Sequence, residues 1–178
     1  MGAAFGGRVR LPASDRRSAP LIFPRGVVAW PVKITDILTI EHSIFCAMFD
    51  QIEQTLPGLT IPAEIQSRAH MLASLLHGHG ETEQNLLYAA LDHMLKEKDH
   101  FGRLFTEHRE MDGRMELVIR TSDPVEARRL FQEAMVLTRE HFLYEEQTIF
   151  PLAEKHLQSE SLEKLGALWK QRHTSNRR

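Results

Sequence analysis

Histidine is the residue type in this chain that could do chemistry, because 178 residues include ten histidines and a single cysteine. Two of the histidines, His79 and His141, stand four positions before a glutamate, Glu83 and Glu145. Side chains four apart lie on one face of a helix, so each pair can direct an imidazole nitrogen and a carboxylate oxygen at one point. Such donors bind iron, manganese or zinc, and the donor types alone do not decide among these metals. The spacing therefore predicts a metal site.

The two pairs belong to two copies of a longer pattern. Each copy opens with a Glu-His dipeptide, Glu41-His42 or Glu107-His108, and a His-x-x-x-Glu pair follows. Three ligands from each copy give a set of six predicted metal ligands: His42, His79, Glu83, His108, His141 and Glu145. Six ligands exceed the four of a tetrahedral zinc site. Two ions, each held by two histidines and both bridged by the two carboxylates, fit the count.

Helices must position these residues. Apolar residues recur with a helical period over residues 34–56, 62–94, 99–119 and 124–152. Pro57-Gly58 ends the first of these helices, and Asp123 followed by Pro124 is a typical start for the last. We predict an all-α fold, an antiparallel up-down-up-down four-helix bundle, with a short additional helix at about 161–170.

The predicted inward faces of these helices mix apolar side chains with the six ligands. Further expected inward positions include Ala90, Met94, Phe105, Asp112, Thr148 and Leu152. Burying ionisable side chains without partners would cost several kcal/mol each. A metal centre inside the bundle would satisfy them together.

Composition limits the classes of partner and the compartment. Lys plus Arg total 22 against 24 Asp plus Glu, so we expect neither nucleic acid nor an anionic membrane as partner. The chain has no run of about 18 apolar residues, which argues against a membrane-spanning helix. The single cysteine, Cys46, excludes an intramolecular disulfide and favours a reducing compartment, so we expect a cytoplasmic protein.

The chain divides into three predicted parts. Residues 1–33 are rich in glycine and proline and are expected to form a flexible tail, residues 34–157 the metal-binding domain, and residues 158–178 a C-terminal helix and tail. The change in composition also suggests that translation begins near Val27 or Val28 and not at Met1.

At these residues the sequence resembles the hemerythrin-like, or HHE cation-binding, domain family. The resemblance covers about residues 34–157, and its most specific part is HFLYEEQTIFP at residues 141–151, supported by EHSIF and EHREM. It implies an antiparallel four-helix bundle around a non-haem di-iron centre of the Fe–O–Fe type, with manganese or zinc as substitutes. The set of four histidines and two glutamates is most similar to di-iron proteins implicated in the repair of iron–sulfur clusters.

One departure from the family bears on function. Oxygen-carrying hemerythrins have an additional histidine four positions from the one that matches His108, whereas this sequence has Leu104 and Asp112 there. The resemblance therefore implies a protein that binds or reacts with a small ligand (oxygen, nitric oxide or peroxide) in sensing or stress response. Two alternatives are iron storage or donation to an apoprotein recipient, for repair of iron–sulfur centres, and an interaction module whose folding is controlled by its metal. Enzymatic activity and oligomeric state, a homodimer included, are left open.

Four residues near the predicted ligands have both a structural and a functional interpretation. They are Cys46, His77, Asp112 and Tyr144. In the structural interpretation they are, in that order, a buried cysteine, a surface histidine, a solvated carboxylate and a tyrosine that packs against its neighbours. In the functional interpretation Cys46 borders the site, His77 lies next to a ligand, Asp112 binds the open coordination position or orients His108, and Tyr144 donates a hydrogen bond to a bridging oxygen.

Overall fold

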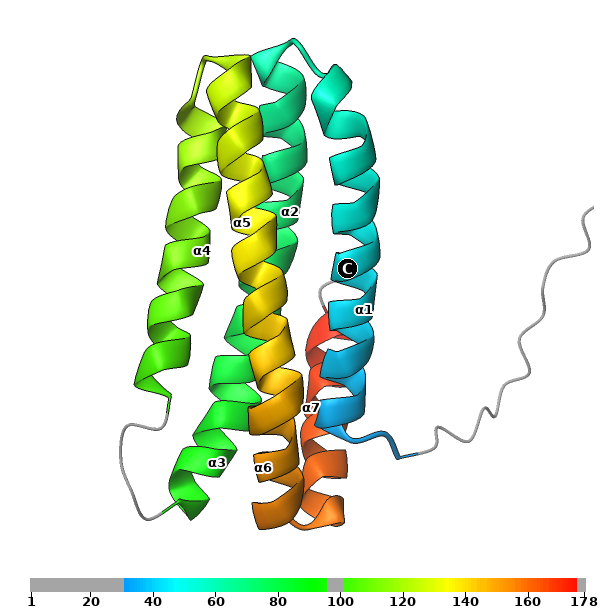
Figure 1. The fold of residues 1–178 in the computed structure, drawn as a ribbon. Coiled ribbons are helices and arrows are strands. Elements are labelled where there is room, and N and C mark those ends of the chain that lie inside the picture. The colour runs from blue at the N-terminus through cyan, green and yellow to red at the C-terminus, as the bar shows by residue number, and fades with distance from the viewer. Residues whose placement is uncertain (1–30, 96–100, 176–178) are drawn as a thin grey trace, which may run out of the picture. The chain divides into compact units, whose positions relative to one another are not determined.

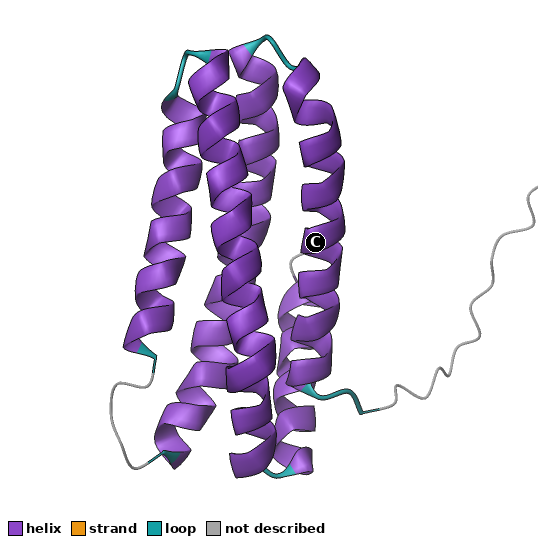
Figure 2. Ribbon diagram, in the orientation of Figure 1, coloured by secondary structure: helices purple, strands orange, loops and turns teal. Residues whose placement is uncertain are grey.

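The computed structural model describes residues 31–95 and 101–175 of the chain. Within these ranges every regular element is a helix, which confirms the predicted all-α class (Figure 2). The predicted tail falls almost entirely in residues 1–30, and the suggested translation start falls there too, so both lie outside the described residues.

Long helices lie side by side in this structure, and shorter segments continue two of them. In chain order the elements are α1 (Ile34–Thr55), a 3-10 turn (Leu56–Gly58), α2 (Pro62–Thr82), a first π segment (Glu83–Tyr88), α3 (Ala89–Met94), α4 (Gly102–Arg120), α5 (Pro124–Tyr144), a second π segment (Glu145–Ile149), α6 (Phe150–His156) and α7 (Ser159–Ser175). None of the described helices is long and apolar enough to cross a membrane.

The signals that start and end helices in the sequence act as expected. The Asp123 carboxylate accepts a hydrogen bond from the backbone N–H of Val125 at 2.9 Å and caps α5, with Pro124 at its first position. The turn containing Pro57 ends α1. The boundaries at these two signals agree with the structure, whereas the additional helix, predicted as a short one at about 161–170, is longer and spans Ser159–Ser175.

Contacts between helices define a bundle with one helix added to it. Helix α4 packs against α2 and α5, α5 also contacts α1 and α2, and α7 packs along α1 (Figure 1). The backbone of α7 approaches the carbonyl oxygen of Val32 at Gly166, where any β-carbon would collide with that oxygen. This close approach explains a glycine inside α7.

Two π segments interrupt the helical repeat, and each begins at a predicted metal ligand, Glu83 or Glu145. Because a π turn holds more residues than an α turn, it shifts the buried face of the chain that follows. The expected inward positions Met94 and Thr148 are therefore wrong, and Ala90 and Leu152 are only half-buried, whereas the structure fully buries Leu91, Ile149 and Ala153.

The inward face of α4 also differs from the prediction. The expected inward positions Leu104, His108 and Met115 are buried, but Phe105 is 40 % exposed and Asp112 is exposed, and Met111 is buried instead. The apolar spacing of α4 allows either face to turn inward, and both choices include His108. In the structure α4 packs against both α2 and α5, with Met111 in place of Asp112 on its buried face.

The core consists of two apolar clusters separated by a polar layer. The first cluster includes Phe45, Phe49, Leu72, Met115 and Phe131. The second includes Ile34, Leu38, Leu91, Leu104 and Phe150. On each of the helices that contribute to both clusters, the predicted metal ligands lie between the two sets of positions.

The first cluster supplies a matched test of the core within α2. Leu72 is fully buried and Leu75 is 47 % exposed on the same helix. We expect Leu72→Ala to lower the free energy of unfolding by about 2–5 kcal/mol, because it removes buried methyl groups and leaves a cavity. The control Leu75→Ala should change it by about 0.5 kcal/mol or less. Urea denaturation measures both values, and equal effects would contradict the assigned orientation of α2.

Candidate metal centre

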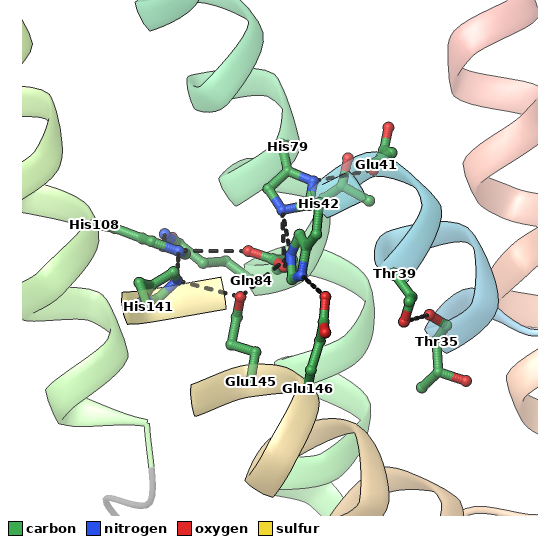
Figure 3. A network of polar contacts seen from close by, with 12 residues as sticks. Thr35, Thr39, Glu41, His42, His79, Gln84, His108, His141, Glu145 and Glu146 are labelled. Carbon is green, nitrogen blue, oxygen red and sulfur yellow. Dashed lines mark hydrogen bonds and ion pairs between the residues drawn. The ribbon is translucent and has the colours of Figure 1, made fainter. Parts of the chain in front are cut away.

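The structure brings all six predicted ligands together in the polar layer. The helices α1, α2, α4 and α5 each supply one histidine (Figure 3), and the two glutamates are the first residues of the two π segments. Every one of the six side chains belongs to a buried residue, and Glu83 and Glu145 have no exposed surface. Burial of two carboxylates in an apolar core requires compensating charge or hydrogen bonds.

The first group of ligand atoms comes from His42, His79, Glu83 and Glu145, and these atoms all lie within 4.8 Å of one another. The two imidazole Nε2 atoms face each other at 3.0 Å. Glu83 Oε1 lies 3.0 Å from His79 Nε2, and Glu145 Oε2 lies 3.5 Å from His42 Nε2. One cation could contact both imidazoles and both carboxylates.

The second group repeats this arrangement with the other two histidines, His108 and His141, and the same carboxylates, Glu83 and Glu145. Here the Nε2 atoms are 2.8 Å apart. Glu83 Oε2 lies 3.4 Å from His108 Nε2, and Glu145 Oε2 lies 3.4 Å from His141 Nε2. Both carboxylates therefore belong to both groups.

The donor atoms of the two groups fit metal ions. Glu83 Oε2 and Glu145 Oε2 are buried and have no hydrogen-bond partner, although buried polar atoms are normally satisfied. Each facing pair of Nε2 atoms can share only one proton. A cation in each group would accept lone pairs from all of these atoms at once, so the polar layer has the chemistry of a site that can hold metal.

The outer nitrogen of each histidine has a side-chain partner. Imidazole Nδ1 atoms lie 3.0 Å from a carboxylate oxygen in the pairs His42 with Glu146 and His79 with Glu41. In the second group, His141 Nδ1 lies 2.8 Å from Glu107 Oε2, and His108 Nδ1 lies 2.7 Å from the amide nitrogen of Gln84. Carboxylate partners that accept Nδ1–H orient His42, His79 and His141 and leave their Nε2 atoms free to bind a metal, whereas His108 is oriented by the amide nitrogen of Gln84.

The outer partners were not predicted from the sequence, although Glu41 and Glu107 belong to the repeated Glu-His dipeptides. Glu41 precedes His42 in the chain but bonds His79, and Glu107 precedes His108 but bonds His141. The repeated Glu-His dipeptide was the signal. Successive residues on a helix point about 100° apart. The glutamate of each dipeptide therefore contacts a histidine of another helix and not the histidine that follows it in the chain.

The charges within the layer are unequal. Burial would raise the pKa of Glu83, but His79 and hydrogen bonds from neighbouring imidazoles hold it well below its ordinary value. Burial and the charge of Glu83 raise the pKa of Glu145 well above its ordinary value. Burial would lower the pKa of His79, but Glu83 and Glu41 raise it to about 10. Protein groups alone thus leave one carboxylate matched by a bound proton on His79, and the other protonated.

The second group has the opposite balance. Burial and the neighbouring His108 lower the pKa of His141 to about 4, despite its contact with Glu107. A neutral imidazole is the form that binds a metal ion. In the first group His79 therefore carries a positive charge at neutral pH, whereas in the second group His141 is neutral.

A tyrosine other than the expected one contacts the cluster. The hydroxyl of Tyr88 in the first π segment donates a hydrogen bond to Glu145 Oε1. Tyr144 instead packs beneath the guanidinium of Arg103, which lies 4.1 Å from its ring centroid. Tyr88 turns toward the cluster because it follows Glu83 within the π segment, a local feature without a recognised signal in the sequence.

The other uncertain residues lie outside the two ligand groups. The side chains of His77 and Asp112 are 63 % and 55 % exposed, with 3.7 Å between His77 Nδ1 and Asp112 Oδ2. Cys46 is half-buried against the first apolar cluster, and burial raises the pKa of its thiol. None of the three contributes to either group among the residues that the structure describes.

The unequal carboxylates predict opposite responses to neutralisation in metal-free protein. Glu145→Gln should raise the free energy of unfolding at neutral pH, because folding of the wild type keeps a proton on Glu145, and this becomes less favourable as pH rises above its ordinary pKa. Glu83→Gln should lower that free energy by about 1–3 kcal/mol, because the ionised form accepts hydrogen bonds from imidazoles. Urea denaturation of the chelator-treated proteins tests this. Shifts in the same direction would contradict the assigned charges.

The contacts at the outer nitrogens are expected to strengthen metal binding. Glu41→Ala and Glu107→Ala should each weaken metal binding about 10–100-fold, because the imidazole that loses its partner is no longer held in orientation. Glu110→Ala is the matched control. Glu110 lies on α4 like Glu107, but it is exposed, whereas Glu107 is partly buried. Competition with a chromophoric chelator measures the affinities. Unchanged affinity in both variants would show that these contacts are incidental.

Comparison with known proteins identifies the family. The model of the hemerythrin HHE cation-binding domain matches residues 33–153, well over half of the chain. Neither the curated proteins nor the solved structures include a match. The two matched glutamates and four histidines of the polar layer all lie inside the matched range. This chain belongs to the hemerythrin HHE cation-binding domain family.

Proposed function

We propose that this protein binds two metal ions in its polar layer, with iron as the metal, and that it binds or reacts with a small ligand in sensing or stress response. The observation that carries the proposal is that two groups of four buried ligand atoms share the same two carboxylates. A site for one ion would need only one group. Family membership supports a cation as the occupant.

Each residue has a defined part in this proposal. His42 and His79 would hold one ion, His108 and His141 the other, and Glu83 and Glu145 would bridge the two. Each ion then has two neutral nitrogen donors and shares two carboxylates, a donor set suited to iron and also to manganese or zinc. Bound iron would supply a change of oxidation state and open coordination positions.

The remaining polar residues keep the ligands ready. Carboxylates at the outer nitrogens accept Nδ1–H, which leaves the Nε2 lone pairs directed inward. The hydroxyl of Tyr88 holds Glu145 Oε1, so this carboxylate keeps one orientation while its other oxygen is without a hydrogen-bond partner. The two apolar clusters cover the layer on either side along the bundle.

We further propose the antiparallel up-down-up-down topology for the bundle and the boundaries 34–157 for the metal-binding domain. Alternating chain direction places the two copies of the sequence pattern around one layer. Contacts of α2 with α4, and of α1 with α5, support this, because each joins helices from the two copies.

Metal stoichiometry tests the proposal directly. Anaerobic reconstitution with ferrous iron should give two ions per chain, and Glu83→Ala should lose both, because it removes an oxygen donor from each group. Glu81→Ala, which alters an exposed glutamate two positions away, should retain two. Elemental analysis of desalted protein gives the counts. One or no ion in the wild type would refute the two-metal proposal, and one ion kept by Glu83→Ala would refute the bridging role.

A further inference from the structure

A cavity of about 430 Å³ lies beside the polar layer, between α2 and α4. It reaches two of the ligands, His79 and His108. Gly80, Met111 and Met115 form part of its inner wall. Small and apolar residues thus form part of the lining, and polar residues such as Asn85 and Arg109 form the rest.

The two copies of the sequence pattern allow this cavity to be compared with its counterpart. Matching His79 to His141 and His108 to His42 pairs α2 with α5 and α4 with α1. The groove between α5 and α1 is therefore the counterpart of the groove between α2 and α4. In a symmetric protein both grooves would give equal access to the layer.

Aromatic rings fill the counterpart groove. Phe142 stands where the first copy has Gly80, and its ring stacks on that of His42 with centroids 3.9 Å apart and planes at 10°. Phe45 stands where α4 has Met111, and its ring centroid lies 5.8 Å from that of Phe142. The face of His42 is covered, and its residue is only 1 % exposed.

The equivalent face of His108 is open because residue 80 has no side chain. A β-carbon placed on Gly80 would lie 3.4 Å from the imidazole of His108, in ordinary contact. A larger side chain at this position would extend over the ring, as Phe142 does over His42. Gly80 is therefore the residue that keeps the cavity connected to the layer.

The outer ends of the two grooves differ in the same sense. Arg139, the counterpart of His77, joins α5 to α1 through ion pairs with Asp50 at 2.8 Å and Glu53 at 2.6 Å. At the mouth of the cavity, α2 and α4 are joined only by a longer and more exposed contact, 3.7 Å between His77 Nδ1 and Asp112 Oδ2, among the residues that the structure describes. One groove is packed with aromatic rings and held by two short ion pairs, and the other holds a cavity whose mouth is crossed by one long, exposed contact.

We propose that a small uncharged molecule, such as a diatomic gas, reaches the polar layer through the cavity between α2 and α4 and not from the opposite side. The proposal rests on the proposed function, which supplies the ligand's destination. Uncharged ligands are favoured because Met111, Met115 and Phe142 line the inner wall and two carboxylates, Glu81 and Asp112, line the cavity against one guanidinium. An anion would meet net negative charge at the mouth and apolar groups inside.

Two substitutions that fill the cavity from opposite helices test the route. Gly80→Leu adds a side chain over His108, and Met111→Phe copies the residue found in the closed groove. Gly78→Leu is the matched control, because it adds the same side chain two positions away where a β-carbon has nothing within 4 Å. Nitric oxide is the probe, mixed in a stopped-flow instrument with each reduced, iron-loaded protein, and iron content is measured on the same samples.

We expect all four proteins to hold two irons, with association of nitric oxide slowed at least about tenfold in Gly80→Leu and Met111→Phe and changed less than about twofold in Gly78→Leu. Normal iron content with unchanged association rates in both cavity variants would overturn the route and leave the proposed function intact. Equal slowing in Gly78→Leu would also overturn it. A wild type that binds no iron would refute the proposed function itself, together with the route.

Discussion

Two carboxylates buried among four imidazoles are the constraint on which this structure depends. Glu83 and Glu145 have no exposed surface, and one oxygen of each has no hydrogen-bond partner. Burying such groups is costly unless positive charge accompanies them. Without a metal, the pKa of His79 and that of Glu145 are both raised, so both groups hold a proton. These protons offset the charge of the two carboxylates. Metal cations would replace those protons and use every free lone pair in the layer.

Much of the bundle is organised around this layer. It divides the core into two apolar clusters, and each of its four imidazoles is held from outside by a second polar side chain. Both π segments begin at the carboxylates, where a local change in helical repeat alters which residues turn inward. Such irregular turns are frequent at functional sites, because the backbone there is adjusted to aim side chains and not only to pack.

The sequence predicted the six clustered residues because a His-x-x-x-Glu pair is tied to helix geometry and occurs twice. It did not predict the features that depend on the exact turn of a helix. Thr148 was expected inside and Ile149 is buried, because the π segment shifts the repeat by a residue. Tyr88 contacts Glu145 for the same local reason. The difference between Gly80 and Phe142 is visible in the sequence, but its consequence for access depends on the packing of α2, α4 and α5 around His108.

Iron-edge anomalous diffraction from crystals of the iron-loaded protein would test the central claim most directly. Two anomalous peaks should lie in the polar layer, one near the Nε2 atoms of His42 and His79 and the other near those of His108 and His141, with oxygens of Glu83 and Glu145 between them. A single peak, or peaks outside this layer such as beside the exposed His77 and Asp112, would contradict a shared two-metal site.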